Sequence, residues 1–293
     1  MHARNSFLLL VLSGVLWGTG GVTGHALADA TGLSAPAIAA YRLTLGGLIL
    51  TALLVRRHRT STRWRPVLAT AVLAALFQSC YFAAVALGTV SVATLITIGS
   101  APLFVLLLDA AGHRRWPAVT QLRPVALGVV GLALLVGAPA GGRSVAAGVA
   151  GAVLAALSGL TFAIFTRYRA RPSADDPEAV TGFGFLLGGL LIGLACVPFT
   201  SLTFPASARS LALLALFAIV PTALAYTLFF RGLAGASAAV ATVVALLEPL
   251  TGTALAVLIF GDRLSPPAIA GAVLLLGSVV DAGRSHRPMP VEL

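Results

Sequence analysis

The sequence predicts an all-α integral membrane protein with ten transmembrane helices arranged as two inverted five-helix repeats. Three observations predict it: the composition, the spacing of the apolar runs, and a similarity between the two halves of the chain. Of the 293 residues, 58% are hydrophobic and only 10% are charged, with a mean hydropathy of +1.00. Soluble domains carry about 25% charged residues. So few charges could not cover a water-facing surface, because the exposed apolar area would aggregate.

Ten apolar runs are long enough to cross a membrane. A helix needs about 20 apolar residues to span the hydrocarbon core, and open sheets are excluded there because their unpaired backbone groups find no water. We interpret the first run as a transmembrane helix and not as a signal peptide, because it is longer than a signal core and has a counterpart in the second half. Short connections predict antiparallel neighbours. The predicted helices cover residues 7–26, 36–55, 66–87, 90–109, 122–138, 145–166, 179–199, 210–230, 237–260 and 266–282.

Arginine placement predicts which side of the membrane each connection faces. The formal net charge is +10, and all 19 basic residues are arginine. With a cytoplasmic N-terminus, 15 arginines face the cytoplasm and three, Arg143, Arg209 and Arg263, face outward. This bias agrees with the positive-inside rule and predicts a multi-pass protein of the cytoplasmic membrane with both termini in the cytoplasm. Because the charge lies in connections between membrane helices, we expect a lipid bilayer and not a nucleic acid as its partner.

The two halves of the chain resemble each other. The segment YRLTLGGLIL at residues 41–50 resembles FGFLLGGLLI at 183–192, and ALGTVSVAT at 86–94 resembles GLAGASAAVAT at 232–242. We therefore divide the chain into a first repeat, residues 1–139, and a second repeat with a short cytoplasmic tail, residues 140–293. Five spans per repeat is an odd number, so the second repeat should be inverted in the membrane. Inverted repeats are typical of alternating-access transporters, whose substrate site lies near the midplane between the repeats.

A proline occupies equivalent places in the fourth and ninth predicted helices. Pro102 follows Ala101 in APL, and Pro249 follows Glu248 in EPL. A proline inside a helix removes a backbone hydrogen bond and kinks the helix, so two symmetric kinks should widen a central cavity. The carboxylate is present in one half only, which indicates a chemical role more than a requirement of the fold.

Two charges fall inside predicted spans. Glu248 costs a few kcal/mol at the centre of a bilayer unless it is paired, hydrated or protonated. We interpret it as a proton-coupling or cation-binding group that faces a cavity; the alternative is a structural carboxylate held by a neighbouring helix. Arg42 is a buried charge early in the second helix. It could extend to the membrane interface, pair with Glu248, or bind an anionic group of the substrate.

Polar and aromatic side chains recur at helical spacing on several predicted spans, as in Gln78 and Tyr81 or Thr222 and Tyr226. Such stripes could line an amphiphilic cavity, although a single Ser or Thr often only bonds its own helix backbone. Trp17 opens WGTGGVTG, where glycines permit close backbone approach. The predicted substrate-cavity residues are Trp17, Gln78, Tyr81, Thr94, Thr97, Ser158, Thr161, Tyr226, Glu248 and Thr251.

Enzyme, metal and nucleotide signatures are missing from the sequence. It contains no HExxH or GxSxG motif and no lysine for a P-loop. The two cysteines, Cys80 and Cys196, lie in separate apolar runs, so neither a disulfide nor a zinc site is indicated. We therefore predict no catalytic residue, no metal and no cofactor.

These features resemble bacterial members of the drug/metabolite transporter superfamily, of the EamA-like kind. The resemblance rests on the two repeats, on SAAVATVVALLEPL at residues 237–250 with its analogue SVATLITIGSAPL at 91–103, and on IFGDRLSPPAIAGAVLLLG at 259–277. The family usually has Glu where Asp262 stands. The resemblance implies export of small metabolites, amino acids or drugs through a central cavity lined by helices 1, 3, 4, 6, 8 and 9.

We predict a secondary transporter that exports small metabolites or amino acids by alternating access, with Glu248 coupling transport to protons. The first alternative is a multidrug exporter in which Glu248 binds lipophilic cations. An intramembrane enzyme or a lipid-handling protein would need at least two convergent catalytic groups, and only Glu248 is well placed. We expect a small-molecule solute as the partner, and the sequence points to no particular oligomeric state.

Overall fold

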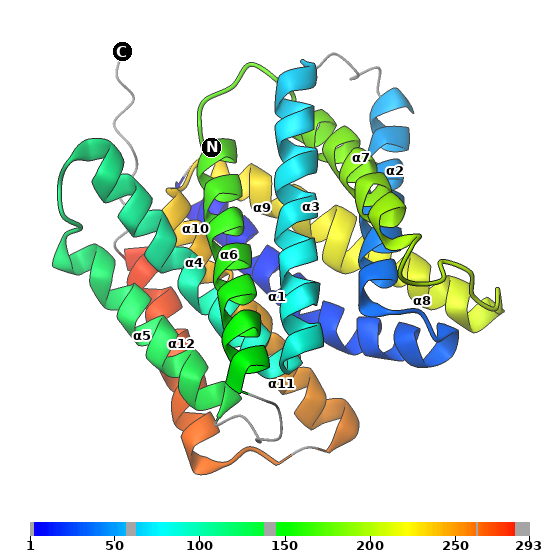
Figure 1. The fold of residues 1–293 in the computed structure, drawn as a ribbon. Coiled ribbons are helices and arrows are strands. Elements are labelled where there is room, and N and C mark those ends of the chain that lie inside the picture. Colours follow the sequence, from blue (N-terminus) through cyan, green and yellow to red (C-terminus); the bar gives the residue numbers. More distant parts are fainter. Residues whose placement is uncertain (1–2, 57–62, 138–144, 262, 285–293) are drawn as a thin grey trace.

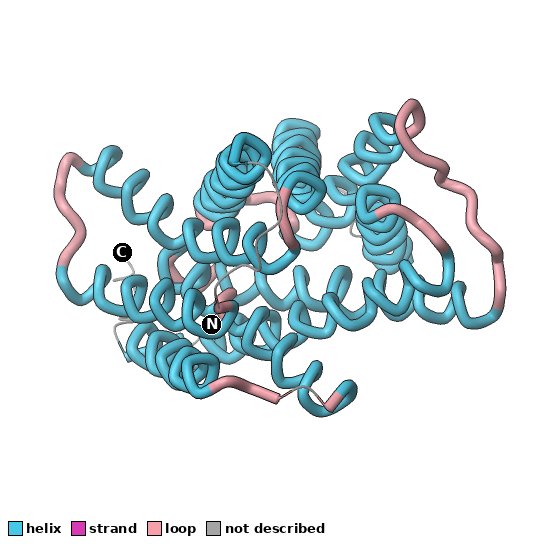
Figure 2. The backbone as a smooth tube through the Cα atoms, turned by 60° about the horizontal axis from the view of Figure 1, so that its bottom comes forward, coloured by secondary structure: helices cyan, strands magenta, loops and turns pink. Residues whose placement is uncertain are grey.

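The computed structural model describes residues 3–56, 63–137, 145–261 and 263–284, and within these ranges the chain forms helices and loops only (Figure 2). Ten helical segments are long and apolar enough to cross a membrane, as the sequence predicts. Their ends fall within a few residues of the expected ones, and the first helix extends furthest beyond expectation, to Thr31. Predictions that involve Arg57, Arg59, Arg143, Asp262 and Arg287 fall outside the described residues.

Eight of the spans are single helices and two are interrupted. The single helices are α1 (Ala3–Thr31), α2 (Ala35–Arg56), α3 (Trp64–Leu87), α4 (Val90–His113), α5 (Val119–Val136), α6 (Val145–Arg169), α7 (Pro177–Cys196) and α12 (Pro266–Arg284). The eighth span consists of α8 (Ala208–Ala218), a π-helical turn η1 (Ile219–Leu224) and α9 (Ala225–Leu233). The ninth span is divided into α10 (Ala238–Val244) and α11 (Leu247–Phe260).

The helix contacts follow the predicted symmetry between the two halves. Helix α2 packs against α7 and α5 against α12, so each of these helices meets its own counterpart. Helix α1 packs against α9 and α11, just as its counterpart α6 packs against α3 and α4. In Figure 1 the α5–α12 pair lies on one side and the α2–α7 pair on the other, with α1, α3, α4 and α6 between them. This pattern is that of two inverted five-helix repeats, as predicted.

The repeated glycine pair explains the tightest of these contacts. A side chain at Gly47 on α2 would meet the backbone of Leu186 on α7, and one at Gly189 on α7 would meet the backbone of Thr44 on α2. Helix association in a membrane depends on such close packing, because lipid is as apolar as the helix faces. The LGGL similarity between the halves therefore encodes one symmetric interface.

Arginine–carboxylate pairs gather at one end of the helix bundle. Arg63 contacts Asp175 at 2.9 Å and Arg167 contacts Asp109 at 2.7 Å. Arg123 pairs with Asp281, and Arg231 with Glu178. Three of these four pairs join the first half of the chain to the second. They lie at the end predicted to face the cytoplasm, so charge pairing there ties the repeats together.

Candidate functional site

A cavity of about 400 Å³ lies between the two halves. Its lining comes from α1, α2, α3, α4 and α6, from the interrupted eighth span, and from the broken ninth span around Ala245 and Glu248. Small-molecule sites commonly enclose about 300–1,000 Å³. The space therefore suits a small organic solute.

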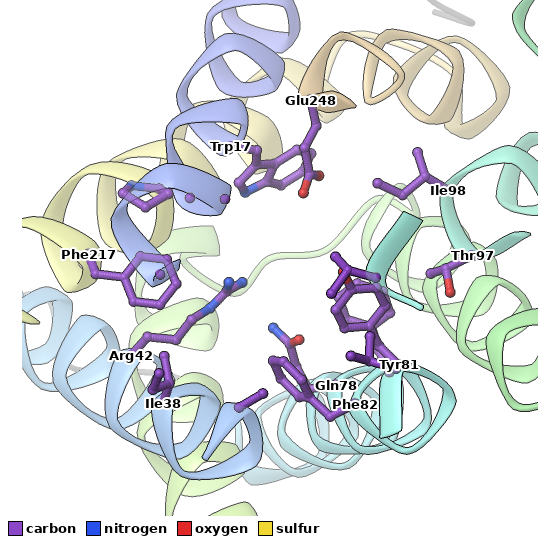
Figure 3. A pocket seen from close by; sticks show the side chains of 18 of the residues that line it. Trp17, Ile38, Arg42, Gln78, Tyr81, Phe82, Thr97, Ile98, Phe217 and Glu248 are labelled. Carbon is purple, nitrogen blue, oxygen red and sulfur yellow. The ribbon is translucent and has the colours of Figure 1, made fainter. Parts of the chain in front are cut away.

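The polar side chains of the cavity stand on different walls. Figure 3 shows the Arg42 guanidinium, the Glu248 carboxylate and the Gln78 amide pointing into the space from α2, α11 and α3. In the described part of the chain, no basic nitrogen lies within the 4 Å ion-pair distance of Glu248. Arg42 and Glu248 thus face one cavity as separate charges, and the pairing that the sequence left open is not formed.

Proline places Glu248 at the start of a helix. Pro249 has no N–H to donate to the carbonyl of Ala245, and its ring crowds that carbonyl. The helix ends at Val244 and restarts at Leu247, with the Glu248 N–H donating to Ala245 across 3.0 Å. Glu248 therefore lies in the first turn of α11, where the helix dipole favours a negative charge.

The two equivalent prolines have different surroundings in the structure. Helix α4 continues through Pro102 without a break, and Pro102 is buried outside the cavity lining. Helix α6 supports α4 beside this point, because Gly159 permits an approach that would leave an added side-chain carbon 2.6 Å from the Thr97 carbonyl. Of the two proline-containing spans, α4 is continuous and the ninth span is divided, and the divided span carries the carboxylate.

Glycines hold α1 directly against the broken span. A side-chain carbon at Gly14 would stand 2.9 Å from the carbonyl of Val244, and one at Gly18 would stand 2.8 Å from the carbonyl of Glu248. Trp17 lies between these two glycines and lines the cavity, as does Gly21 further along the helix. The WGTGG run is therefore a packing surface that brings an indole ring beside the site.

Aromatic rings close one end of the cavity. The Trp17 ring meets Tyr226 with centroids 4.9 Å apart, Phe229 at 4.8 Å and Phe162 at 6.2 Å. All four side chains are buried, and buried Phe165 and Phe230 follow them toward the arginine-rich end. Such edge-to-face clusters pack without voids large enough for a solute.

Arg169 fastens the helices beyond this aromatic layer. Its guanidinium lies 4.4 Å from the Phe230 ring centroid. It donates to the hydroxyls of Thr70 at 3.3 Å and Thr181 at 3.1 Å, and to the carbonyl of Pro177 at 2.9 Å. One side chain of α6 thus contacts α3, α7 and α9 together, which closes the bundle at the predicted cytoplasmic end.

The cavity extends to the opposite end of the bundle. Its lining includes His25 and Ala28 near the end of α1, Ala35 at the start of α2, and Val85 and Val90 on either side of the α3–α4 connection. Figure 1 shows the α1–α2 and α3–α4 connections at the bottom and the α6–α7 connection at the top. The cavity therefore reaches the end that the arginine pattern predicts to face outward.

The predicted cavity residues divide into two groups. Trp17, Gln78, Tyr81, Thr97, Tyr226 and Glu248 line the cavity. Four others do not: Thr94 accepts or donates a 2.9 Å hydrogen bond with Tyr81, Ser158 donates to the Phe77 carbonyl, Thr161 donates to the Leu157 carbonyl, and Thr251 packs against Gly18. The structure thus places these four side chains outside the cavity lining, where each takes part in a hydrogen bond or in helix packing.

Several lining residues were not predicted. Phe82 follows Gln78 by four residues and Phe77 precedes Tyr81 by four, so helical spacing could have identified both. The family resemblance left helix 2 out of the lining, yet this helix contributes Ile38 together with Arg42, for which a substrate contact was one of the alternatives. Phe217 and Pro221 reach the cavity through the π-helical turn, in which Thr222 donates to the Phe217 carbonyl at 2.9 Å. No pattern in the sequence predicts that turn, although π-helical turns are frequent at functional sites.

Comparison with known proteins gives the family. The profile of the EamA-like transporter family matches residues 4–137 and again residues 147–281. The chain belongs to the EamA-like transporter family. This EamA-like protein is 31% identical to the uncharacterised transporter YwfM of Bacillus subtilis (strain 168), over 97% of this chain and 96% of that protein. It is 23% identical to the uncharacterised inner membrane transporter YicL of Salmonella typhimurium (strain LT2), over 94% of each.

A solved crystal structure shares the fold of this EamA-like transporter. It superposes with a TM-score of 0.82 at 21% identity, covering 95% of this chain and 96% of that one. Family and relatives together make the protein a multi-pass membrane transporter and not an enzyme. Within the described residues no three His, Cys, Asp or Glu side chains converge as metal ligands.

Proposed function

We propose that this EamA-like transporter exports a small metabolite or amino acid from the cytoplasm by alternating access, with Glu248 coupling the cycle to protons. The observation that carries the proposal is an unpaired carboxylate in a cavity that reaches one end of the bundle only. A buried charge without a counter-ion is costly in a membrane and marks a functional site. A site open to one side and closed to the other is one half of an alternating-access cycle.

The orientation follows from the arginine pattern. With both termini in the cytoplasm, the arginine-rich end faces inward and the cavity faces outward. The structure then corresponds to the stage at which an exporter releases its solute and takes up a proton. The return to an inward-facing state requires the aromatic layer around Trp17 and the Arg169 contacts to separate.

Glu248 suits a coupling role because its charge can be neutralised in two ways. Either a proton or a cationic group of the solute can neutralise the Glu248 carboxylate. When the carboxylate is deprotonated and has no cation bound, the dipole of α11 stabilises its charge from the first turn of that helix. Competition between proton and solute for one carboxylate would exchange them across the membrane. Movement of the proton down its gradient would then drive the solute outward.

The test compares metabolites released by cells that express wild type, Glu248→Gln, or Asp29→Asn at equal membrane levels. Asp29 is an exposed carboxylate and supplies the matched control. We expect a solute enriched in the medium by wild type and Asp29→Asn but not by Glu248→Gln. Vesicles loaded with that solute should still exchange it in Glu248→Gln while losing uphill transport. Unchanged uphill transport by Glu248→Gln would remove this residue from the mechanism.

A second candidate is an exporter of lipophilic cations. The aromatic wall beside a carboxylate favours it, since aromatic faces and a negative charge both attract organic cations. Tetraphenylphosphonium bound in competition with protons, and lost in Glu248→Gln, would support this candidate. If tetraphenylphosphonium does not bind, the second candidate is refuted and the metabolite exporter remains the proposed function.

A further inference from the structure

We propose that Arg42 is a specificity-determining residue that binds a carboxylate of the transported solute, so that the cavity selects zwitterions held between Arg42 and Glu248. The proposal rests on the proposed function, because it assigns ends of the solute to the two charges of the same cavity. It goes beyond that function by giving the solute's chemistry and a role for α2.

Side-chain N–H donors without a hydrogen-bond partner indicate that the solute carries an anionic group. In the described part of the chain, two buried nitrogen donors have no hydrogen-bond partner: Nε of Arg42 and Nε1 of Trp17. Both residues line the cavity, and Trp17 is only 6% exposed. Buried polar groups are nearly always paired in proteins, and arginine and tryptophan side chains donate but cannot accept. The complementary group must therefore supply acceptor oxygens.

The guanidinium is held in position by an aromatic ring. Its central carbon lies 5.2 Å from the Phe217 ring centroid, at the π-helical turn of the eighth span. Contact with the ring face orients the planar guanidinium, and the Nε–H on its edge has no partner. A carboxylate fits that edge with two parallel hydrogen bonds.

The Glu248 carboxylate restricts which kind of anionic solute can bind to Arg42. Glu248 faces the same space from α11, and the Gln78 amide points between the two charges from α3 (Figure 3). A dianion such as a phosphate ester would be repelled by an ionised Glu248, and a simple cation would leave the donors of Arg42 and Trp17 unpaired. A solute with one carboxylate and one ammonium group satisfies both ends. Phe77, Phe82 and Ile38 would contact its apolar part.

The chain offers a built-in reporter of binding. It has three tryptophans, of which Trp64, at the start of α3, is 74% exposed and Trp116, in the α4–α5 connection, is 89% exposed. Replacing these two by phenylalanine leaves Trp17, inside the cavity, as the single fluorophore. Full-length protein with this background is reconstituted in nanodiscs, and the Trp17 emission is titrated with non-absorbing compounds.

Three compounds that share the 3-methylbutyl chain of leucine distinguish the contribution of each charged group to binding. Leucine carries both charges, 4-methylpentanoate lacks the ammonium, and 3-methylbutylamine lacks the carboxylate. We expect leucine to bind most tightly. Arg42→Met should weaken leucine and 4-methylpentanoate about tenfold or more, as loss of a charge-assisted bidentate contact does, and leave 3-methylbutylamine unchanged. The exposed Arg171→Gln should change none of the three.

Other outcomes overturn the proposal. Equal weakening of all three compounds by Arg42→Met, no weakening of the two carboxylates, or a wild-type Trp17 that responds to no carboxylate would each do so. If Arg42→Met does not fold, Arg42→Lys is the second variant, because it keeps the positive charge but loses the planar guanidinium that makes two parallel hydrogen bonds. Arg42→Lys should weaken leucine binding and leave 3-methylbutylamine binding unchanged. Amine binding alone would refute the role of Arg42 yet leave export at Glu248 intact. Conversely, Arg42-dependent leucine binding with unchanged uphill transport in Glu248→Gln would refute the coupling and keep this proposal.

Discussion

The indole ring of Trp17 on α1 packs edge-on against the phenol ring of Tyr226 on α9, with centroids 4.9 Å apart and planes at 65°. This contact joins the two halves of the chain at the closed end of the cavity. It also connects the helix that approaches Glu248 most closely to the span that carries the π-helical turn. The packing of the form seen here and the closure of the cavity at this end thus depend on the same rings.

Removal of the Trp17 ring should destabilise the fold. Trp17→Ala should lower the free energy of unfolding by about 3–5 kcal/mol, the cost of deleting a buried aromatic side chain, whereas Trp17→Phe should lose much less. Denaturant unfolding in mixed micelles measures the effect. Trp116→Ala, at an 89% exposed position, is the control and should cost little. An equal loss at both positions would contradict the packing role of Trp17.

Gly18 should tolerate no side chain. In Gly18→Ala the new carbon would stand 2.8 Å from the Glu248 carbonyl and would also collide with Thr251. Because the carbonyl belongs to the backbone, α1 must move away from α11, at a cost of about 1–3 kcal/mol. Gly21→Ala on the same helix meets nothing within 4 Å and should be neutral or slightly stabilising. Thermal unfolding of the pair, together with transport, tests the prediction.

The Arg169 contacts should hold the predicted cytoplasmic end closed. Ala28→Cys, in a background with Cys80 and Cys196 replaced by serine, places a thiol in the cavity lining near the predicted outer end. An impermeant maleimide added to intact cells should label it, which also tests the orientation. Arg169→Gln loses the contact with Phe230 and three hydrogen bonds, so labelling should fall several-fold as the inward-facing state gains population. Exposed Arg171→Gln should leave labelling unchanged; a fall there as well would point to a general charge effect.

The Arg63–Asp175 pair should stabilise the protein in a pH-dependent way. Hydrogen bonds from Arg63 and Ser173 hold the pKa of the Asp175 carboxyl well below its usual range. A depressed carboxyl pKa adds stability above the unfolded-state value of about 4 and loses it as the pH falls below that value. Asp175→Asn should therefore lower the melting temperature at neutral pH, and the difference should shrink in acid. Since Arg63 is exposed, high salt should also reduce the difference in melting temperature. A difference that changes with neither pH nor salt would contradict a stabilising Arg63–Asp175 ion pair.

The local pattern of the sequence determined the membrane class, the ten spans and the inverted repeat. Composition and run length decide whether a segment can leave water, and these properties need no knowledge of its neighbours. The repeated LGGL motif and the EPL motif likewise marked a helix interface and a carboxylate in the cavity wall, both of which the structure shows.

Which side chains meet in the cavity was decided by tertiary structure, because small changes in helix rotation move a residue from one face to another. Thr161 bonds its own helix while its neighbour Phe162 lines the cavity. Arg42 faces Glu248 without pairing because α2 and α11 stand on different walls. The two prolines have different surroundings: α4 is continuous through Pro102, whereas the ninth span divides just before Pro249. A sequence sets the preference of each helix, but the cavity is the space left when all ten pack against one another.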